Sequence, residues 1–190
     1  HQLGAPLVRI MTSKKEQILW GSNGAEKWNV AKGAWETLPP LIAPAVELAR
    51  AEGLTLVVET GNGTMVNSNF TARKLIDDLG AKDTLKVLWD PANNCWCHER
   101  AFPDGYDEVR DGYLGHIHIK DVKVDTPRAH LEVREMGTGQ LADQFRPMAD
   151  ALRADGYDGV ISFESVYHPG NGDFEAGFRN SIGLFKEIFG

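Results

Sequence analysis

Four residues able to bind a divalent cation lie at or near the carboxyl ends of short apolar segments. Glu59 ends the segment 54–59, Asp90 ends 85–90, Glu164 ends 159–164, and His118 lies just before the end of 115–121. If these segments are parallel strands, their ends meet at one edge of the sheet, where such folds place functional sites. Three carboxylates and an imidazole favour Mn²⁺, with Mg²⁺, Co²⁺ and Zn²⁺ open. The sequence therefore predicts one divalent metal site formed by these four side chains.

Each of these residues also has a purely structural interpretation. Asp90 precedes Pro91, so its carboxylate is equally suited to cap the first turn of a helix. A glutamate at a strand end can pair with a basic side chain. His118 alternates with His116 on an apolar segment, where a histidine can fill a core position. The recurrence of ligand-type residues at equivalent strand ends, on the face that alternation assigns to each of them, favours the metal interpretation.

Five apolar segments are predicted to be strands, and longer periodic segments are predicted to be helices. The strands are residues 7–11, 54–59, 85–90, 115–121 and 159–164; the helices are residues 35–52, 71–79, 141–154 and 174–189, with a weaker helix at 104–111. Valine, isoleucine and leucine dominate most of the strands, which is typical of strands buried on both faces. The alternation predicts an α/β fold in which helices cover a parallel sheet.

Two parallel architectures fit this alternation: an open doubly wound sheet, or part of a closed (β/α) TIM barrel. A doubly wound dinucleotide-binding sheet carries a glycine-rich turn after its first strand. Residues 12–15 are Thr-Ser-Lys-Lys, and Gly61 and Gly63 lack a third glycine at the required offset. The sequence therefore offers little support for a dinucleotide site. A complete barrel needs about 250 residues, whereas this chain has 190.

Composition and charge narrow the classes of partner. The chain has 20 Lys and Arg against 27 Asp and Glu, a net charge of -7, and no basic stripe of the kind that neutralises nucleic-acid phosphates. No apolar run approaches the ~20 residues that span a membrane, and the first residues do not resemble a signal peptide. Cys95 and Cys97 are too close in the sequence to form a disulfide that stabilises the fold, and free thiols are typical of the cytoplasm. We expect a cytoplasmic protein without nucleic-acid or membrane partners.

The predicted strand ends resemble those of a known family. The carriers are Val-Val-Glu-Thr-Gly-Asn-Gly at 57–63, Leu-Trp-Asp-Pro-Ala-Asn at 88–93, Gly-His-Ile-His-Ile-Lys-Asp at 115–121 and the segment 156–165. In this order and spacing they resemble the xylose-isomerase-like superfamily of sugar phosphate isomerases and epimerases. The resemblance implies a single TIM-barrel domain over residues 1–190 that holds about strands 4–8 of the eight, with the first three strands absent. Such an open arc is expected to expose apolar edges.

The resemblance also implies a mechanism and a set of site residues. Members of the family remove a proton next to a sugar carbonyl through an enediolate, with one divalent ion stabilising the charge. The implied metal ligands are Glu59, Asp90, His118 and Glu164; Glu59 and Glu164 are also the catalytic acid/base pair; and His116, Lys120, Asn93 and Trp20 are candidate substrate contacts.

The predicted function is that of a metal-dependent isomerase or epimerase acting on a small sugar or polyol. A lyase or dehydratase of a keto-sugar or cyclitol stays open, because elimination starts from the same enediolate. A non-catalytic sugar-binding or truncated domain stays open as well, as does a homo-oligomer. Asn93 and Val124 stand where epimerases of the family often have His and Arg, which argues against a ketose 3-epimerase in particular.

Overall fold

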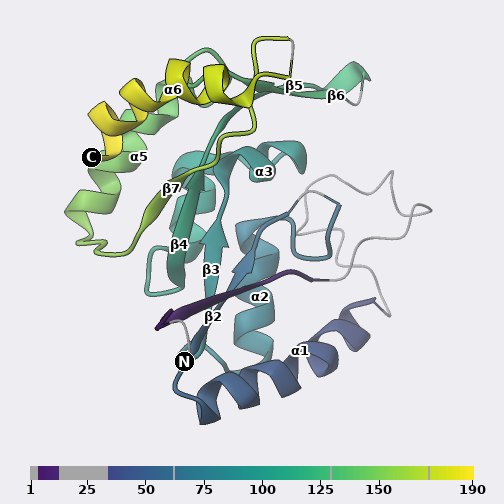
Figure 1. The fold of residues 1–190 in the computed structure, drawn as a ribbon. Helices are drawn as coiled ribbons and strands as arrows, with labels where there is room; N and C mark the ends of the chain where they lie inside the picture. Colours follow the sequence, from purple (N-terminus) through teal and green to yellow (C-terminus); the bar gives the residue numbers. More distant parts are fainter. Residues whose placement is uncertain (1–3, 13–33, 62, 129, 171) are drawn as a thin grey trace.

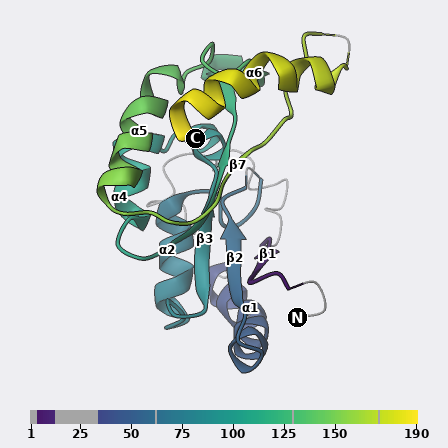
Figure 2. The same ribbon diagram turned by 60° about the vertical axis from the view of Figure 1, so that its left-hand side comes forward.

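The computed structural model describes residues 4–12, 34–61, 63–128, 130–170 and 172–190. Its central sheet consists, in spatial order, of β1 (Leu7–Ile10), β2 (Thr55–Glu59), β3 (Leu85–Trp89), β4 (Leu114–Ile119) and β7 (Ile161–Phe163). Every neighbouring pair is parallel, so all five strands end at the same edge. The sheet curls into half a barrel, with helices packed along it (Figures 1 and 2). The prediction of a partial parallel barrel is confirmed.

The main helices lie where the apolar periodicity predicted them: α1 (Ala34–Ala51), α2 (Asn69–Asp78), α5 (Ala142–Ala154) and α6 (Phe174–Phe189). Each presents an apolar stripe to the core; in α5 the side chains of Phe145 and Met148 are fully buried. Helix α2 begins at Ser68, whose hydroxyl accepts from the Thr71 amide at 3.0 Å in a capping box. The predicted helix at 104–111 is a short turn, η2 (Ala101–Gly105), followed by α4 (Tyr106–Val109).

Side chains alternate between the two faces of the sheet as the strand pattern predicted. In β4, Ile117 and Ile119 are fully buried in the hydrophobic core. His116 and His118 alternate with them in sequence and therefore point to the other face, which is the inside of the barrel. The same alternation buries Trp89 in the core and turns Asp90, the next residue, inward. The sheet thus carries apolar packing on its outer face and polar groups inside, near the strand ends.

A second sheet and one helix were not predicted. Strands β5 (Asp121–Asp125) and β6 (His130–Arg134) form an antiparallel hairpin, and α3 (Pro91–Trp96) follows β3 directly. The buried Asp121 carboxylate organises the turn after the hairpin, because it accepts from the amides of Gly137 (3.0 Å), Gly139 (2.8 Å) and Leu141 (3.2 Å). A Cβ at Gly139 would lie 2.6 Å from the Val122 carbonyl oxygen and would also collide with the Asp121 carboxylate. Glycine is therefore required there.

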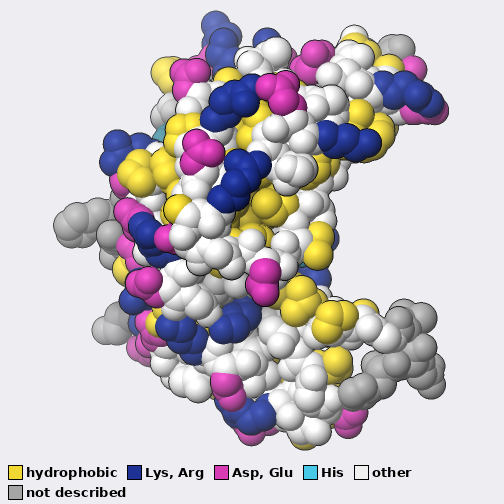
Figure 3. Space-filling view, turned by 90° about the vertical axis from the view of Figure 1, so that its left-hand side faces the viewer, with side chains coloured by type: hydrophobic (Ala, Val, Ile, Leu, Met, Phe, Trp, Pro, Cys, Tyr) yellow, Lys and Arg dark blue, Asp and Glu magenta, His cyan; other side chains and the backbone are white. Residues whose placement is uncertain are grey.

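The half-barrel leaves apolar side chains on its surface. The space-filling view is hollowed on its right-hand side, and hydrophobic side chains gather around the hollow (Figure 3). Among the exposed large hydrophobic residues, Val8 and Met11 belong to or follow β1, and Val160 precedes β7. Apolar surface is thus exposed near both edge strands, as the open arc predicted. Within the part of the chain that the structure describes, no helix is long and apolar enough to cross a membrane.

Candidate metal centre

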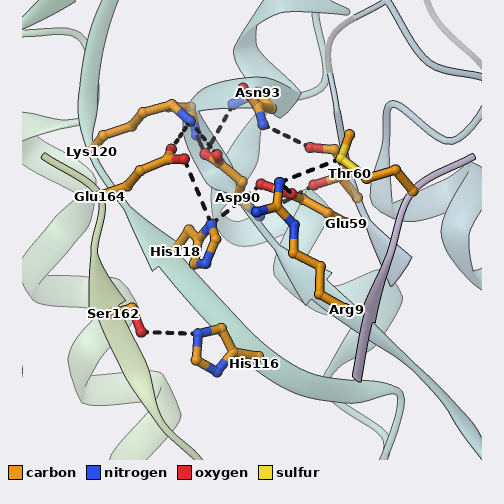
Figure 4. Close-up of polar contacts among 12 residues, drawn as sticks. Arg9, Glu59, Thr60, Asp90, Asn93, His116, His118, Lys120, Ser162 and Glu164 are labelled. Carbon is orange, nitrogen blue, oxygen red and sulfur yellow. Dashed lines mark hydrogen bonds and ion pairs between the residues drawn. The ribbon is translucent and has the colours of Figure 1, made fainter. Parts of the chain in front are cut away.

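Three of the four predicted metal ligands converge at one point. Glu59, Asp90 and His118 come from the ends of β2, β3 and β4, and each offers a ligand atom within 4.8 Å of the others. Glu59 Oε1 lies 3.2 Å from His118 Nδ1. Figure 4 shows these side chains pointing toward one another above the sheet. The convergence follows from the parallel register, which aligns the ends of neighbouring strands.

Asp90 serves both interpretations of its sequence position. It is the N-cap of α3: its Oδ1 accepts from the Ala92 amide at 3.1 Å and the Asn93 amide at 3.2 Å, and Pro91 occupies the first helical position. The other oxygen, Oδ2, faces the site and pairs with Lys120. Burial raises the pKa of Asp90 to about 6, although the nearby Lys120 ammonium acts in the opposite direction. The cap thus fixes the carboxylate without using its second oxygen.

Glu164 lies beside the three-residue cluster rather than within it. Its backbone amide donates to the Ile119 carbonyl at 2.9 Å just beyond β7, which brings its side chain over the end of β4. Its Oε1 is 4.0 Å from His118 Nδ1, while its Oε2 pairs with Lys120. The side chain is 28% exposed, whereas that of Glu59 is 3% exposed. Glu164 is therefore the more accessible of the two glutamates.

Two cationic side chains neutralise part of the acidic cluster. Lys120 forms ion pairs with both Asp90 and Glu164, and Arg9 of β1 forms one with Glu59. Burial acts to raise the pKa of Glu59, but the His118 ring and the Arg9 guanidinium outweigh it and hold that pKa below its usual value. Arg9 was not among the residues predicted for the site. The pairing of β1 with β2 aligns Arg9 with Val57 and so brings its side chain to Glu59.

The residues present fit a divalent ion. Among the described residues, His118 Nδ1 is buried and faces the carboxylate oxygens of Glu59 and Glu164 without a well-aligned hydrogen bond, and Glu59 Oε2 is buried with the Arg9 ion pair as its contact. Buried polar atoms normally have well-aligned hydrogen bonds, so an imidazole nitrogen facing carboxylate oxygens without one suits a shared cation. Two carboxylates and an imidazole nitrogen are donors that Mn²⁺, Mg²⁺, Co²⁺ and Zn²⁺ all accept.

The predicted substrate contacts have different surroundings. His116 lies one layer deeper than His118, with Nε2 3.0 Å from the Ser162 hydroxyl, and burial lowers its pKa. The side-chain amide Nδ2 of Asn93 donates to the Thr60 carbonyl at 2.9 Å. Trp20 lies outside the described residues. Among the described candidates, the Lys120 side chain pairs with the carboxylates of Asp90 and Glu164, and the Asn93 backbone amide donates to Asp90 Oδ1. Contact of any of them with substrate stays a prediction.

The half-barrel and the strand-end cluster together are typical of a barrel family that uses the carboxyl ends of its strands. The family model of the xylose isomerase-like TIM barrel matches residues 1–188, and the chain belongs to that family. This confirms the resemblance seen in the sequence. No curated protein matches the chain significantly.

Solved structures with the same fold come from several sources. A 3-keto-D-glucoside 4-epimerase from E. coli is 23% identical over 78% of this chain and 52% of its own, with a TM-score of 0.54. A xylose isomerase-like TIM barrel protein from Mycobacterium smegmatis, in complex with magnesium, is 20% identical over 99% and 62%, with a TM-score of 0.64. A probable 3-DHS dehydratase from Bacillus anthracis is 14% identical over 92% and 62%, with a TM-score of 0.64. At these identities the likeness concerns the fold, and this chain spans between 52% and 62% of their lengths.

Proposed function

We propose that the protein is a divalent-metal-dependent sugar isomerase or epimerase that moves a proton next to a carbonyl group. The observation that carries the proposal is the convergence of Glu59, Asp90 and His118, with Glu164 beside them, at the carboxyl ends of the barrel strands. Membership of the xylose isomerase-like family and the likeness to an epimerase and a magnesium complex support the same class of chemistry.

The four side chains Glu59, Asp90, His118 and Glu164 would hold the ion, for which Mn²⁺ is our first choice. A bound divalent ion supplies electrostatic stabilisation of the negative charge that develops on a substrate oxygen. Asp90, fixed by the α3 cap, has the role of a rigid anchor. Glu164 is partly exposed and one of its oxygens is already held, so it can exchange a proton with a bound sugar. Glu59 faces it across the site and is the second member of the proposed acid/base pair.

The charges around the site favour a neutral polyol over a sugar phosphate. Binding of a phosphate requires uncommitted arginine or lysine side chains, or a glycine-rich helix N-terminus. Among the described residues, the two cations in contact with the cluster, Arg9 and Lys120, are already paired with its carboxylates. We therefore expect a free ketose to bind at least as tightly as its phosphate ester in a competition assay. Phosphate binding tighter by tenfold or more, ~1.4 kcal/mol, would contradict this substrate class.

Dehydration of a keto-sugar or cyclitol is the second candidate, favoured by the structural likeness to a probable dehydratase. Both reactions begin with removal of the same kind of proton and differ in whether a hydroxyl group then leaves. The site contains no feature that selects between them among the described residues. The two candidates are separated by the products.

The test is proton NMR of Mn²⁺-loaded protein with neutral ketoses and 3-keto-glucosides in D₂O, with the ion removed before spectra are recorded. Epimerisation or isomerisation replaces a carbon-bound proton with deuterium, whereas dehydration also removes a hydroxyl group from the substrate. Glu59→Gln and Glu164→Gln should abolish exchange, while Glu187→Gln, an exposed glutamate paired with Arg146, should leave it unchanged. Exchange that survives in both site variants would contradict the assigned roles.

A further inference from the structure

Lys120 is the one buried cation of the site that the proposed proton transfer does not use. It follows β4 and shares the inner face with His116 and His118, each two residues apart. Its side chain is 11% exposed, and its Nζ pairs with Asp90 Oδ2 and Glu164 Oε2 (Figure 4). One ammonium group thus links two predicted metal ligands that lie far apart in the sequence.

The contacts divide the carboxylate oxygens between different tasks. Asp90 Oδ1 is held by the amides of α3, and Asp90 Oδ2 is held by Lys120. Glu164 Oε2 is held by Lys120, which leaves Glu164 Oε1 4.0 Å from His118 Nδ1 and facing the cluster. Lys120 therefore fixes which oxygen of Glu164 is presented to the centre.

The sheet does not fix this arrangement by itself. In the strand order β3-β4-β7, the strands that precede Asp90 and Glu164 each pair with β4 and are not neighbours of one another. Glu164 also follows a three-residue edge strand, and its side chain is partly exposed. Among the described residues, Lys120, which directly follows the strand between them, is the side chain that forms ion pairs with both carboxylates.

We propose that Lys120 is a positioning residue that holds Asp90 and Glu164 in the geometry for a divalent ion, an inference that rests on the proposed metal-dependent function. Loss of an outer group that orients metal ligands typically weakens metal binding 10–100-fold. A lysine that acted only as a repelling positive charge would give the opposite result, because its removal would strengthen the attraction for a cation. The sign of the change in affinity therefore separates the two roles.

The experiment is titration calorimetry of Mn²⁺ binding to the wild type, Lys120→Met and Lys86→Met, with the Mn²⁺ electron paramagnetic resonance spectrum of each complex. Lys86 is a matched control: it lies on the inner face of β3 near the amino end of that strand, away from the carboxyl ends that carry the cluster, and its Nζ donates to the Gly112 carbonyl at 2.6 Å. We expect Lys120→Met to bind Mn²⁺ 10–100-fold more weakly with an altered spectrum, and Lys86→Met to match the wild type within about twofold. Thermal melting without metal shows whether Lys120→Met folds. If it does not, Lys120→Gln replaces it, with the same expected loss of Mn²⁺ affinity.

The outcomes separate this inference from the function on which it rests. A wild type that binds Mn²⁺, together with a Lys120 variant that binds it equally or more tightly, would overturn the positioning role and leave the proposed function standing. A wild type that binds no Mn²⁺ would overturn the proposed function and the role of Lys120 with it. Recovery of affinity in Lys120→Arg, whose guanidinium can donate to both carboxylates, would strengthen the case for positioning.

Discussion

Replacement of Asp90 by asparagine separates its two structural roles. The side-chain amide oxygen of the asparagine can still accept from the backbone amides at the start of α3, and asparagine caps helices as well as aspartate does. The negative charge that would bind an ion is lost. Asp90→Asn should therefore keep the cap of α3, and any loss of stability without metal should come from the lost ion pair with Lys120. Asp90→Ala also removes the cap and should cost a further 0.5–2 kcal/mol, typically about 1.

Binding of Mn²⁺ should stabilise the folded protein by more than the helix cap does, and only in variants that keep the metal site. At a Mn²⁺ concentration 100 times the dissociation constant, binding stabilises the folded state by ~2.7 kcal/mol. For a domain of this size 1 kcal/mol moves the melting temperature by roughly 2–4 °C, so we expect a rise of roughly 5–10 °C in the wild type. Asp90→Asn loses a carboxylate ligand, and at the same Mn²⁺ concentration its rise should fall below about 2 °C.

The assay is thermal unfolding followed by circular dichroism, with and without Mn²⁺. Asp155→Asn is the matched control, because Asp155 pairs with Arg110 and Tyr106 and takes no part in the strand-end cluster. Its unfolding temperature without metal should shift, but its rise on Mn²⁺ addition should equal that of the wild type. A full rise in Asp90→Asn would refute the assignment of Asp90 as a ligand. No rise in the wild type would refute the metal site itself.

Two further predictions concern the scaffold. Gly139→Ala, whose Cβ collides with the Asp121 carboxylate, should destabilise the protein by ~1–3 kcal/mol in urea unfolding. Gly183→Ala, with open space at a helix interior, should stabilise it by ~0.5–1 kcal/mol; equal effects would show that the Asp121 turn does not need glycine. The hydrogen bond from Tyr106 holds the pKa of Asp155 below its usual 3.8. The stabilisation by the Asp155 carboxylate is therefore fully present above pH 3.8 and is lost as the pH falls through its lower folded pKa. The melting difference between wild type and Asp155→Asn should shrink as the pH falls from about 5 to below 3.8. A difference that stays constant over this range would contradict the shift.

The fold could be predicted where burial is strongest. Strands β2 and β3 are almost entirely buried, so their sequences are mostly apolar runs that can be recognised without a structure. Helix α3 was missed although its cap, Asp90 with Pro91, was recognised, because six residues are too few to show a helical period. The β5–β6 hairpin was missed because its order depends on the long-range contacts of Asp121 with Gly137 and Gly139.

The predicted metal ligands could be grouped from the sequence, whereas the charged partners of these ligands could not. Parallel strands bring their ends to one edge whatever their side chains are, so Glu59, Asp90 and His118 could be grouped from their positions alone. The partners of those residues depend on strand register and side-chain conformation. Arg9 reaches Glu59 only because β1 lies beside β2, and Lys120 reaches Asp90 only because it follows the neighbouring strand. Such information is absent from a linear pattern.

The two cations of the site differ in what their removal should do, and this leads to a final prediction. Arg9 is 49% exposed and pairs with one carboxylate, so its ion pair is worth about 0–1 kcal/mol and an incoming ion can displace it at that cost. Arg9→Met should therefore tighten Mn²⁺ binding by up to about fivefold, whereas Lys120→Met should weaken it. The same calorimetric titration measures both variants, and their melting without metal provides the control for folding. Weakening of similar size in both would show that the two cations act alike and would contradict the division between a displaceable and a positioning charge. Arg9 lies on the edge strand β1, whereas Lys120 follows β4, between β3 and β7. The predicted difference therefore places the cation that an incoming ion displaces at the β1 edge of the sheet.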